Sequence, residues 1–113
     1  MIQVTLYRDY QRKLQRLVVK GHAEFGEYGK DIVCAAVSGI TIGLTNASET
    51  LLGVRVHREV DPEAGGLLDC RVPQGLTPDV EARVRLLLEA MAASLQSVAD
   101  EYGSYVTITE DSH

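Results

Sequence analysis

Hydrophobic and polar residues alternate at the start of the chain, where Ile2, Val4 and Leu6 recur at every second position. A period of two is typical of a β-strand that buries one face. A polar turn over residues 8–13 separates this strand from a second apolar run at residues 14–20. The pattern therefore predicts an N-terminal β-hairpin.

A long segment without charge follows at residues 32–48, a run of 17 positions. A membrane-spanning helix needs about 20 predominantly apolar residues, so we expect a buried helix of a folded domain instead. At helical spacing this segment has three sides. We expect the apolar side to face the sheet, and it contains Val33, Val37, Ile40, Leu44, Ala47 and Leu51. The polar side contains Asp31, Cys34, Ser38, Thr41, Thr45 and Ser48, and the small-residue side contains Ile32, Ala36, Gly39 and Gly43.

The remaining pattern predicts two strands, a helix and a last strand. The strands are expected at residues 54–60, marked by three valines, and at 67–72, with a turn at 62–66 between them. Thr77 and Pro78 are a favourable N-cap and first residue for a second helix, and Gly103 is a plausible stop. Residues 105–109 form the final strand. The order β-β-α-β-β-α-β predicts an α+β fold, with two helices on a mixed or antiparallel five-stranded sheet.

Length and charge narrow the possible functions. The 113 residues fit one domain, residues 1–113, with no linker or repeat. Eleven Lys and Arg residues stand against 16 Asp and Glu residues, a net charge of −5. This balance argues against direct nucleic-acid binding, which needs clustered cations, and favours a basic partner. The N-terminal alternation is unlike a secretory signal, so we expect a cytoplasmic protein that does not enter a membrane.

The two cysteines, Cys34 and Cys70, have no spacing typical of a zinc site or a disulfide framework, so we expect neither a metal nor another cofactor. Cys70 shares a strand face with Leu68 and Val72, which predicts a buried thiol. Cys34 lies on the polar side of the first helix, near its start. If Asp31 caps this helix, the unpaired N–H groups of the first turn favour a Cys34 thiolate and a developing oxyanion.

His22 precedes Cys34 by 12 positions and is a candidate base, because it lies where the second strand ends. Two roles fit Asp31, namely capping the helix or orienting His22. Ser38, one turn beyond Cys34, either lines a cleft or is simply solvated. Gly26 and Gly29 fit either a lid over the site or ordinary turns. The other histidines are weaker candidates, since His57 is expected on a solvated strand face and His113 ends the chain.

The segment from Gly21-His22-Ala23 through Gly29 to Asp31-Ile32-Val33-Cys34-Ala35-Ala36-Val37-Ser38 resembles the signature of the ribosomal-processing cysteine protease family called Prp. The resemblance implies a Cys34 nucleophile and a His22 base in a small homodimeric enzyme with a mobile loop between them. It also implies a substrate, the N-terminal extension of the twenty-seventh large-subunit ribosomal protein of bacteria. Family substrates have aromatic residues before the cut and a lysine-rich stretch after it, which suits an acidic protein with Glu24 and Glu27 on the loop.

Two alternatives to a protease remain open at this stage. The same cleft would serve a non-catalytic ribosome-assembly or peptide-binding module. A thiol redox sensor is weakened by the absence of a second cysteine at short spacing. The small-residue side of the first helix has two interpretations as well. It packs either against the second helix of the same chain or against a second copy in a homodimer.

Overall fold

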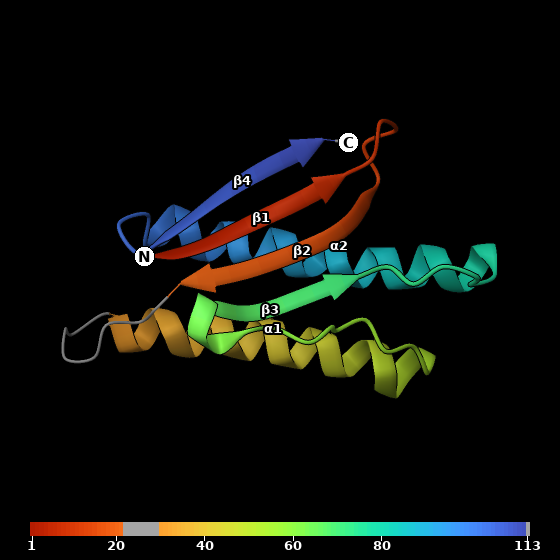
Figure 1. Cartoon of the computed structure of the whole chain (residues 1–113), viewed down its shortest axis with the longest axis horizontal. Helices are drawn as coiled ribbons and strands as arrows, with labels where there is room; N and C mark the ends of the chain where they lie inside the picture. Colours follow the sequence, from red (N-terminus) through yellow and green to blue (C-terminus); the bar gives the residue numbers. More distant parts are fainter. Residues whose placement is uncertain (22–29, 113) are drawn as a thin grey trace.

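The computed structural model describes residues 1–21 and 30–112, with side chains over residues 32–111 in the second stretch. The predicted base His22, the loop residues Gly26 and Gly29, and the side chain of Asp31 lie outside the described residues. Along the chain (Figure 1) the elements are β1 (Ile2–Arg8), β2 (Leu14–Gly21), α1 (Lys30–Leu52), a 3-10 turn η1 (Pro62–Ala64), β3 (Gly66–Arg71), α2 (Pro78–Glu101) and β4 (Val106–Ser112).

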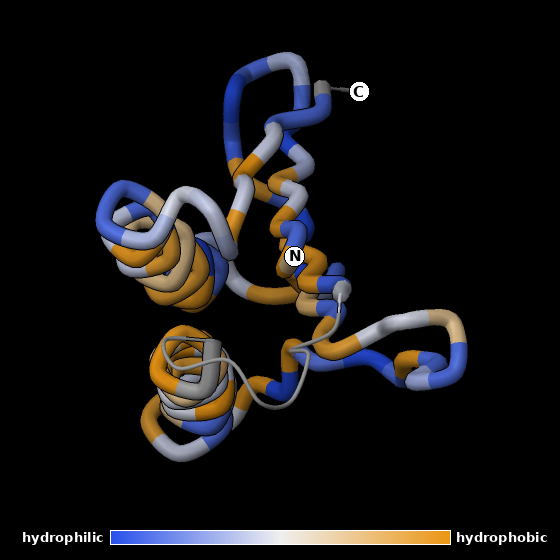
Figure 2. The backbone as a smooth tube through the Cα atoms, turned by 90° about the vertical axis from the view of Figure 1, so that its left-hand side faces the viewer, coloured by the Kyte–Doolittle hydropathy of each residue, from blue (hydrophilic) through white to orange (hydrophobic). Residues whose placement is uncertain are grey.

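The four strands form one mixed sheet in the order β3-β2-β1-β4. β1 pairs antiparallel with β2 and parallel with β4, while β2 pairs antiparallel with β3. Figure 2 shows both helices on the same face of this sheet. The predicted α+β class, the hairpin and the two helices are therefore confirmed, and the core lies between the helices and the sheet.

The predicted five-stranded sheet is wrong, because residues 54–60 do not form a strand. Val54 and Val56 are buried as the alternation requires, but the segment forms only one isolated bridge, between His57 and Cys70. Its backbone bonds to β3 are Arg71 N–H to the Val56 carbonyl, 2.8 Å, and Arg58 N–H to the Asp69 carbonyl, 2.7 Å. Beyond them the segment leaves β3 and turns through η1. Alternating burial thus reflects contact with the core and not continuous pairing.

The face that α1 presents to the core also differs from the expectation. Val33 and Val37 are buried as predicted, but Leu51, at the far end of the same side, is 72% exposed. The C-terminal half of the helix buries hydroxyl side chains in its place, and each has a partner. Thr41 Oγ1 donates to the Val37 carbonyl, Ser48 Oγ donates to the Val54 carbonyl, and Thr45 Oγ1 lies 3.5 Å from Cys70 Sγ.

Helix α2 follows the sequence prediction closely. Thr77 is its N-cap and accepts a hydrogen bond from the Val80 N–H, and Pro78 is its first residue. The helix ends at Glu101, two residues before the predicted stop at Gly103. Its core-facing residues recur at spacings of three and four, and the buried ones are Val84, Leu88, Met91, Ala92 and Leu95.

The outward side of α1 is open in the monomer. A Cβ at either Gly39 or Gly43 would have nothing within 4 Å, so α2 does not cover this side, although it contacts α1 elsewhere. By length and composition alone, Ile32–Leu52 is long and apolar enough to cross a membrane, with 28% of that window buried. Here the helix packs one side on the core, and its exposed positions between Ile32 and Asn46 carry no charge.

Candidate active site

The chain enters the candidate site through Gly21, the last residue of β2. Gly21 has φ +121°, a conformation that favours glycine, and a Cβ there would overlap the Met1 carbonyl oxygen. Gly21 N–H also donates to the Gly65 carbonyl, at 2.9 Å. These contacts fix the strand end that leads directly to position 22, and they bring the turn at residues 62–65 beside it.

Cys34 is the fifth residue of α1, since the helix begins at Lys30 and not after a cap at Asp31. A cap at Asp31 would have made Cys34 the third residue of the helix, so Cys34 lies two positions further into the helix than predicted. Helical side chains lean toward the N-terminus, so the Cys34 side chain still extends over the first turn, where N–H groups lack helical partners. Cys34 is half-buried, and its side chain packs against the edge of the core.

Cys70 differs from Cys34 in its burial. It is fully buried on β3 among core residues, as predicted. Burial raises the pKa of the Cys70 thiol, and the contact with Thr45 offsets only part of this rise. A protonated thiol without solvent access is a poor nucleophile. Of the two thiols, Cys34 is the one that a substrate can reach.

Other predicted site residues have mixed outcomes. Ser38 is exposed one turn beyond Cys34, on the same side of α1. His57, expected on a solvated face, is half-buried and lines a cavity beside α1. Within the described residues no cluster of His, Cys, Asp or Glu side chains could hold a metal ion.

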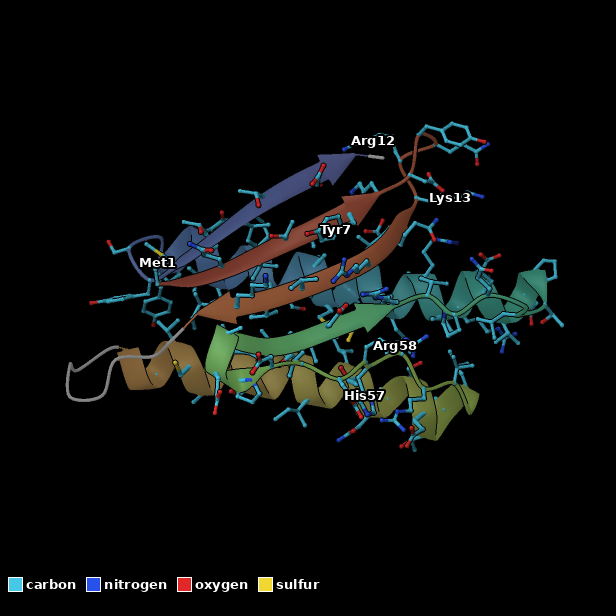
Figure 3. The ribbon with its side chains drawn as sticks, in the orientation of Figure 1. Met1, Tyr7, Arg12, Lys13, His57 and Arg58 are labelled. Carbon is cyan, nitrogen blue, oxygen red and sulfur yellow. The ribbon has the colours of Figure 1, made fainter. Side chains whose placement is uncertain are left out.

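The cavity beside α1 was not anticipated from the sequence. It has a volume of about 270 Å³ and lies between α1, β3 and a segment we call the strap, residues 57–61. Figure 3 shows His57 and Arg58 of the strap over α1. Four of the eight lining residues are apolar. The lining comprises Ile42, Thr45 and Asn46 from α1, His57, Arg58 and Val60 from the strap, and Leu67 and Leu68 from β3. The available signal was the spacing of Ile42 and Asn46, which continue an i+4 row from Cys34 and Ser38.

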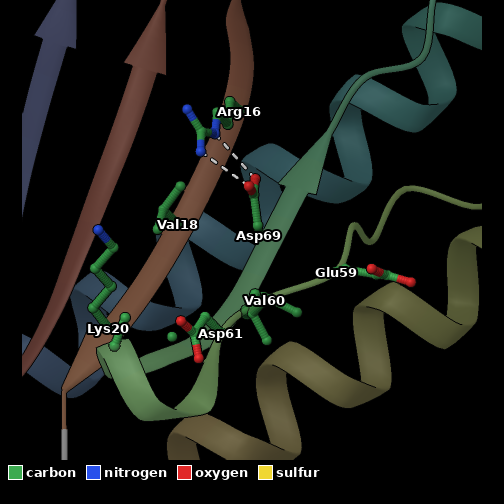
Figure 4. Close-up of a pocket in the computed structure, with 10 residues that line it drawn as sticks. Arg16, Val18, Lys20, Glu59, Val60, Asp61 and Asp69 are labelled. Atoms are coloured by element: carbon green, nitrogen blue, oxygen red, sulfur yellow. Dashed lines mark hydrogen bonds and ion pairs between the residues drawn. The ribbon is translucent and has the colours of Figure 1, made fainter.

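A second cavity, of about 210 Å³, opens on the outer face of the sheet at the other side of Val60 (Figure 4). Its charged wall is an ion-pair cluster. Asp69 accepts two hydrogen bonds from Arg16, at 3.0 and 2.9 Å, and pairs with Arg71. Burial acts to raise the pKa of Asp69, but the two guanidinium groups outweigh it and lower that pKa. Arg16 also lies over the Tyr7 ring, 5.0 Å from its centroid. This cluster ties β1, β2 and β3 together on the outer face.

Comparisons with known proteins agree with this arrangement. The family model described as "Cysteine protease Prp" matches residues 1–107. The chain is 32% identical over 109 residues to the Ribosomal processing cysteine protease Prp of Bacillus subtilis, covering 96% of each chain.

Solved structures give the same result. The structure of SMU.848 from Streptococcus mutans has a TM-score of 0.84 and 34% identity, covering 100% of this chain and 96% of that one. Two structures of the ribosomal processing protease Prp from S. aureus, one with a substrate peptide and one with a covalently linked product peptide, have TM-scores of 0.74 at 28% and 29% identity. Each match covers 98% of this chain and 100% of the other.

The family decides between the alternatives that the sequence left open. A non-catalytic module and a redox sensor are both set aside, because the family is enzymatic and one relative holds a covalently linked product peptide. This chain is a cysteine protease and belongs to the Prp family of ribosomal-processing proteases.

Proposed function

We propose that this protease removes the N-terminal extension of the twenty-seventh large-subunit ribosomal protein, with Cys34 as nucleophile and His22 as base. The observation that carries the proposal is the position of Cys34. It is the half-exposed thiol at the start of α1, in a chain whose relatives are ribosomal processing proteases. The fixed strand end at Gly21 supports the role of His22, because position 22 follows it directly.

The proposed reaction proceeds in two halves. The Cys34 thiolate attacks the scissile carbonyl carbon, and N–H groups at the start of α1 stabilise the oxyanion. His22, in its protonated form, donates a proton to the leaving amine as the C–N bond breaks, which leaves a thioester on Cys34. Neutral His22 then removes a proton from water, the hydroxide attacks the thioester, and the thiol is released with the peptide carboxylate.

The charge of the chain supports a basic substrate segment. The net charge is −5, and such an excess attracts a lysine-rich peptide and speeds its association. We also propose that the reaction takes place in the cytoplasm, where the substrate is synthesised and cysteines remain reduced.

We further propose that the protein is a homodimer through the small-residue side of α1. Gly39 and Gly43 have open space where a Cβ would lie, and Ile32 beside them is 50% exposed. Uncharged helix surfaces with small residues allow close approach of a second helix. Gly43→Glu tests this surface, because a Cβ at Gly43 has nothing within 4 Å in the monomer. We expect light scattering to give twice 12.3 kDa for the parent and 12.3 kDa for the variant. A parent mass of 12.3 kDa at working concentrations would contradict the dimer.

Cleavage of a defined peptide tests the proposed function. The peptide should span the extension and the first residues of the mature ribosomal protein from the same organism. We expect the parent to cut at the junction, and His22→Ala to lose most of kcat while KM changes little. A scrambled peptide of the same composition is the control for charge-driven binding. If the parent leaves the peptide intact, the proposed substrate is wrong; if His22→Ala retains full kcat, the proposed base is wrong.

A further inference from the structure

The side of α1 that carries Cys34 continues as a row toward the C-terminus of the helix. Cys34, Ser38, Ile42 and Asn46 are spaced by four residues, so their side chains follow one another along one ridge of the helix. Cys34 and Ser38 precede the apolar cavity, and Ile42 and Asn46 line it. The accessible thiol and the cavity therefore belong to the same ridge, and the open glycine face proposed for the dimer lies further round the helix.

The opposite wall is the strap, which is attached at both of its ends. Arg58 N–H donates to the Asp69 carbonyl near one end, and Gly66 N–H donates to the Asp61 carbonyl, 2.9 Å, at the other. A Cβ at Gly66 would lie 3.0 Å from that carbonyl oxygen and 3.1 Å from Val60 Cβ, so glycine permits this close approach. Between the two attachments the cavity opens to solvent. The turn at residues 62–65, which follows the strap, is hydrogen-bonded to Gly21 at the end of β2.

The chemistry of the cavity favours a large apolar side chain. Three exposed apolar residues surround it: Ile42 is 59% exposed, Leu67 51% and Val60 36%. Covering them with an apolar group removes this surface from water. Arg58 lies at the rim and forms no ion pair with another described residue, so a lysine or arginine side chain would meet an uncompensated positive charge there.

The distance to Cys34 gives the position of that side chain in a bound peptide. Ile42 lies eight residues from Cys34 along α1, which corresponds to about 12 Å, and Asn46 lies about 18 Å away. An extended peptide rises about 3.3 Å per residue, so four or five residues span the interval.

Building on the proposed peptidase function, we propose that this cavity is a specificity subsite that receives an apolar side chain of the substrate four or five residues from the scissile bond. The argument for a peptide as occupant is continuity with the thiol. An extended chain attached at Cys34 would reach the cavity if it followed the ridge of α1, and the relative from S. aureus holds a covalently linked product peptide. The subsite selects substrates by an apolar anchor remote from the reacting atoms and rejects a cationic residue at the same place.

Kinetics of matched variants test this subsite. Ile42→Ser and Leu67→Ser replace exposed residues, and Leu86→Ser is the control, since Leu86 is 68% exposed on α2 and does not line the cavity. With the junction peptide as substrate, we expect the first two variants to raise KM about tenfold with kcat within about twofold, and the control to change neither. Lysine at the anchoring position of the peptide should raise KM for the parent, because it would meet the positive charge of Arg58. An unchanged KM for Ile42→Ser overturns the proposal.

Photocrosslinking locates the peptide independently of turnover. Cys34→Ala protein is mixed with junction peptides that carry a benzoylphenylalanine at successive positions, and the crosslinked residues are mapped by mass spectrometry. We expect a probe four or five residues from the junction to crosslink to the strap or to Ile42. Crosslinks elsewhere overturn the subsite even if the parent cuts the peptide.

The two experiments also separate the subsite from the proposed function. Crosslinks at the cavity without cleavage by the parent support the subsite and contradict the proposed reaction. The absence of both crosslinks and cleavage overturns both. If Ile42→Ser halves the mass in light scattering and leaves KM unchanged, a second copy of the chain occupies the cavity and the peptide subsite is wrong.

Discussion

The surroundings of Cys34 and Cys70 show how one small core supports two different thiols. Cys70 is the next-to-last residue of β3, fully buried, with Thr45 as its polar neighbour and a raised pKa. Cys34 lies at the beginning of α1, half-buried, at the edge of the same core. Both thiols contact apolar residues, but only Cys34 reaches the surface, because it lies in the first turns of a helix at the edge of the core. The difference shows that the reactivity of a thiol here depends on its position in its helix or strand.

The largest effect on kcat should come from replacing one of the two cysteines, and we compare alanine at each position. Cys34→Ala removes the nucleophile, so we expect kcat for the junction peptide to fall at least about a thousandfold with little loss of stability. Cys70→Ala removes a buried sulfur and leaves a small void, so we expect nearly parental kcat and a free energy of unfolding lower by about 1–2 kcal/mol. Peptide kinetics and urea unfolding of both variants check the comparison. A parental kcat in Cys34→Ala, or a thousandfold loss of kcat in Cys70→Ala, would contradict the assignment of Cys34 as the reactive thiol.

The next effect concerns the strand end that supports the candidate site. Gly21→Ala combines a left-handed φ with an overlap at the Met1 carbonyl, so we expect a loss of about 2–3 kcal/mol of stability and a reduced kcat. Gly53→Ala is the matched control, because Gly53 has φ +67° and open space around its Cβ position. We expect about 1 kcal/mol there and unchanged kcat. Equal losses in the two variants would show that the contact with Met1 has no role.

The ion-pair cluster on the outer face should give a smaller, pH-dependent effect. The folded-state pKa of Asp69 is lowered below its unfolded value, so its contribution is complete above the unfolded pKa, about 3.9, and disappears as pH falls toward the folded pKa. We expect Asp69→Asn to cost about 1–2 kcal/mol at pH 7 and progressively less below about pH 4. Urea unfolding at pH 7 and pH 3 measures this. A cost that stays constant between the two pH values would contradict the assignment.

The smallest effect separates the sulfur–hydroxyl contact from packing at Cys70. Thr45→Val keeps the volume of the side chain and removes its hydroxyl, which lies 3.5 Å from Cys70 Sγ. The variant loses a weak contact to sulfur, but it also no longer buries a hydroxyl. Because these two effects oppose each other, we expect the free energy of unfolding to change by less than about 1 kcal/mol. Thermal unfolding should move by no more than about 4 °C. A loss above 2 kcal/mol would mean that the hydroxyl has a larger structural role.

Local signals explain which parts of the fold were predictable. α2 was predicted because its cap at Thr77, its proline at the first position and its apolar spacing all lie within one segment. The prediction of a strand at residues 54–60 was wrong because the alternation of Val54 and Val56 indicates burial only. A strand also needs continuous hydrogen bonding, and this segment lies beside β3 over only a few residues. The five-stranded sheet followed from that single error.

The side of α1 illustrates a second limit. Thr41, Thr45 and Ser48 were assigned to a polar side on their chemistry, yet all three are buried. A hydroxyl is buried at low cost when it has a hydrogen-bonding partner, and two of these partners, the Val54 carbonyl and Cys70 Sγ, come from other segments. The contrast between the two cysteines did follow from spacing alone, because strand alternation and helical position describe each thiol locally.

Thiol alkylation followed against activity tests the central claim, that Cys34 is the nucleophile, most directly. The native protein is treated with iodoacetamide at pH 7, and the fraction modified at each cysteine is measured by peptide mass spectrometry alongside cleavage of the junction peptide. We predict that Cys34 reacts while Cys70 stays protected until the protein unfolds, and that activity falls in proportion to modification of Cys34. Full activity in protein whose Cys34 is completely alkylated would contradict the account.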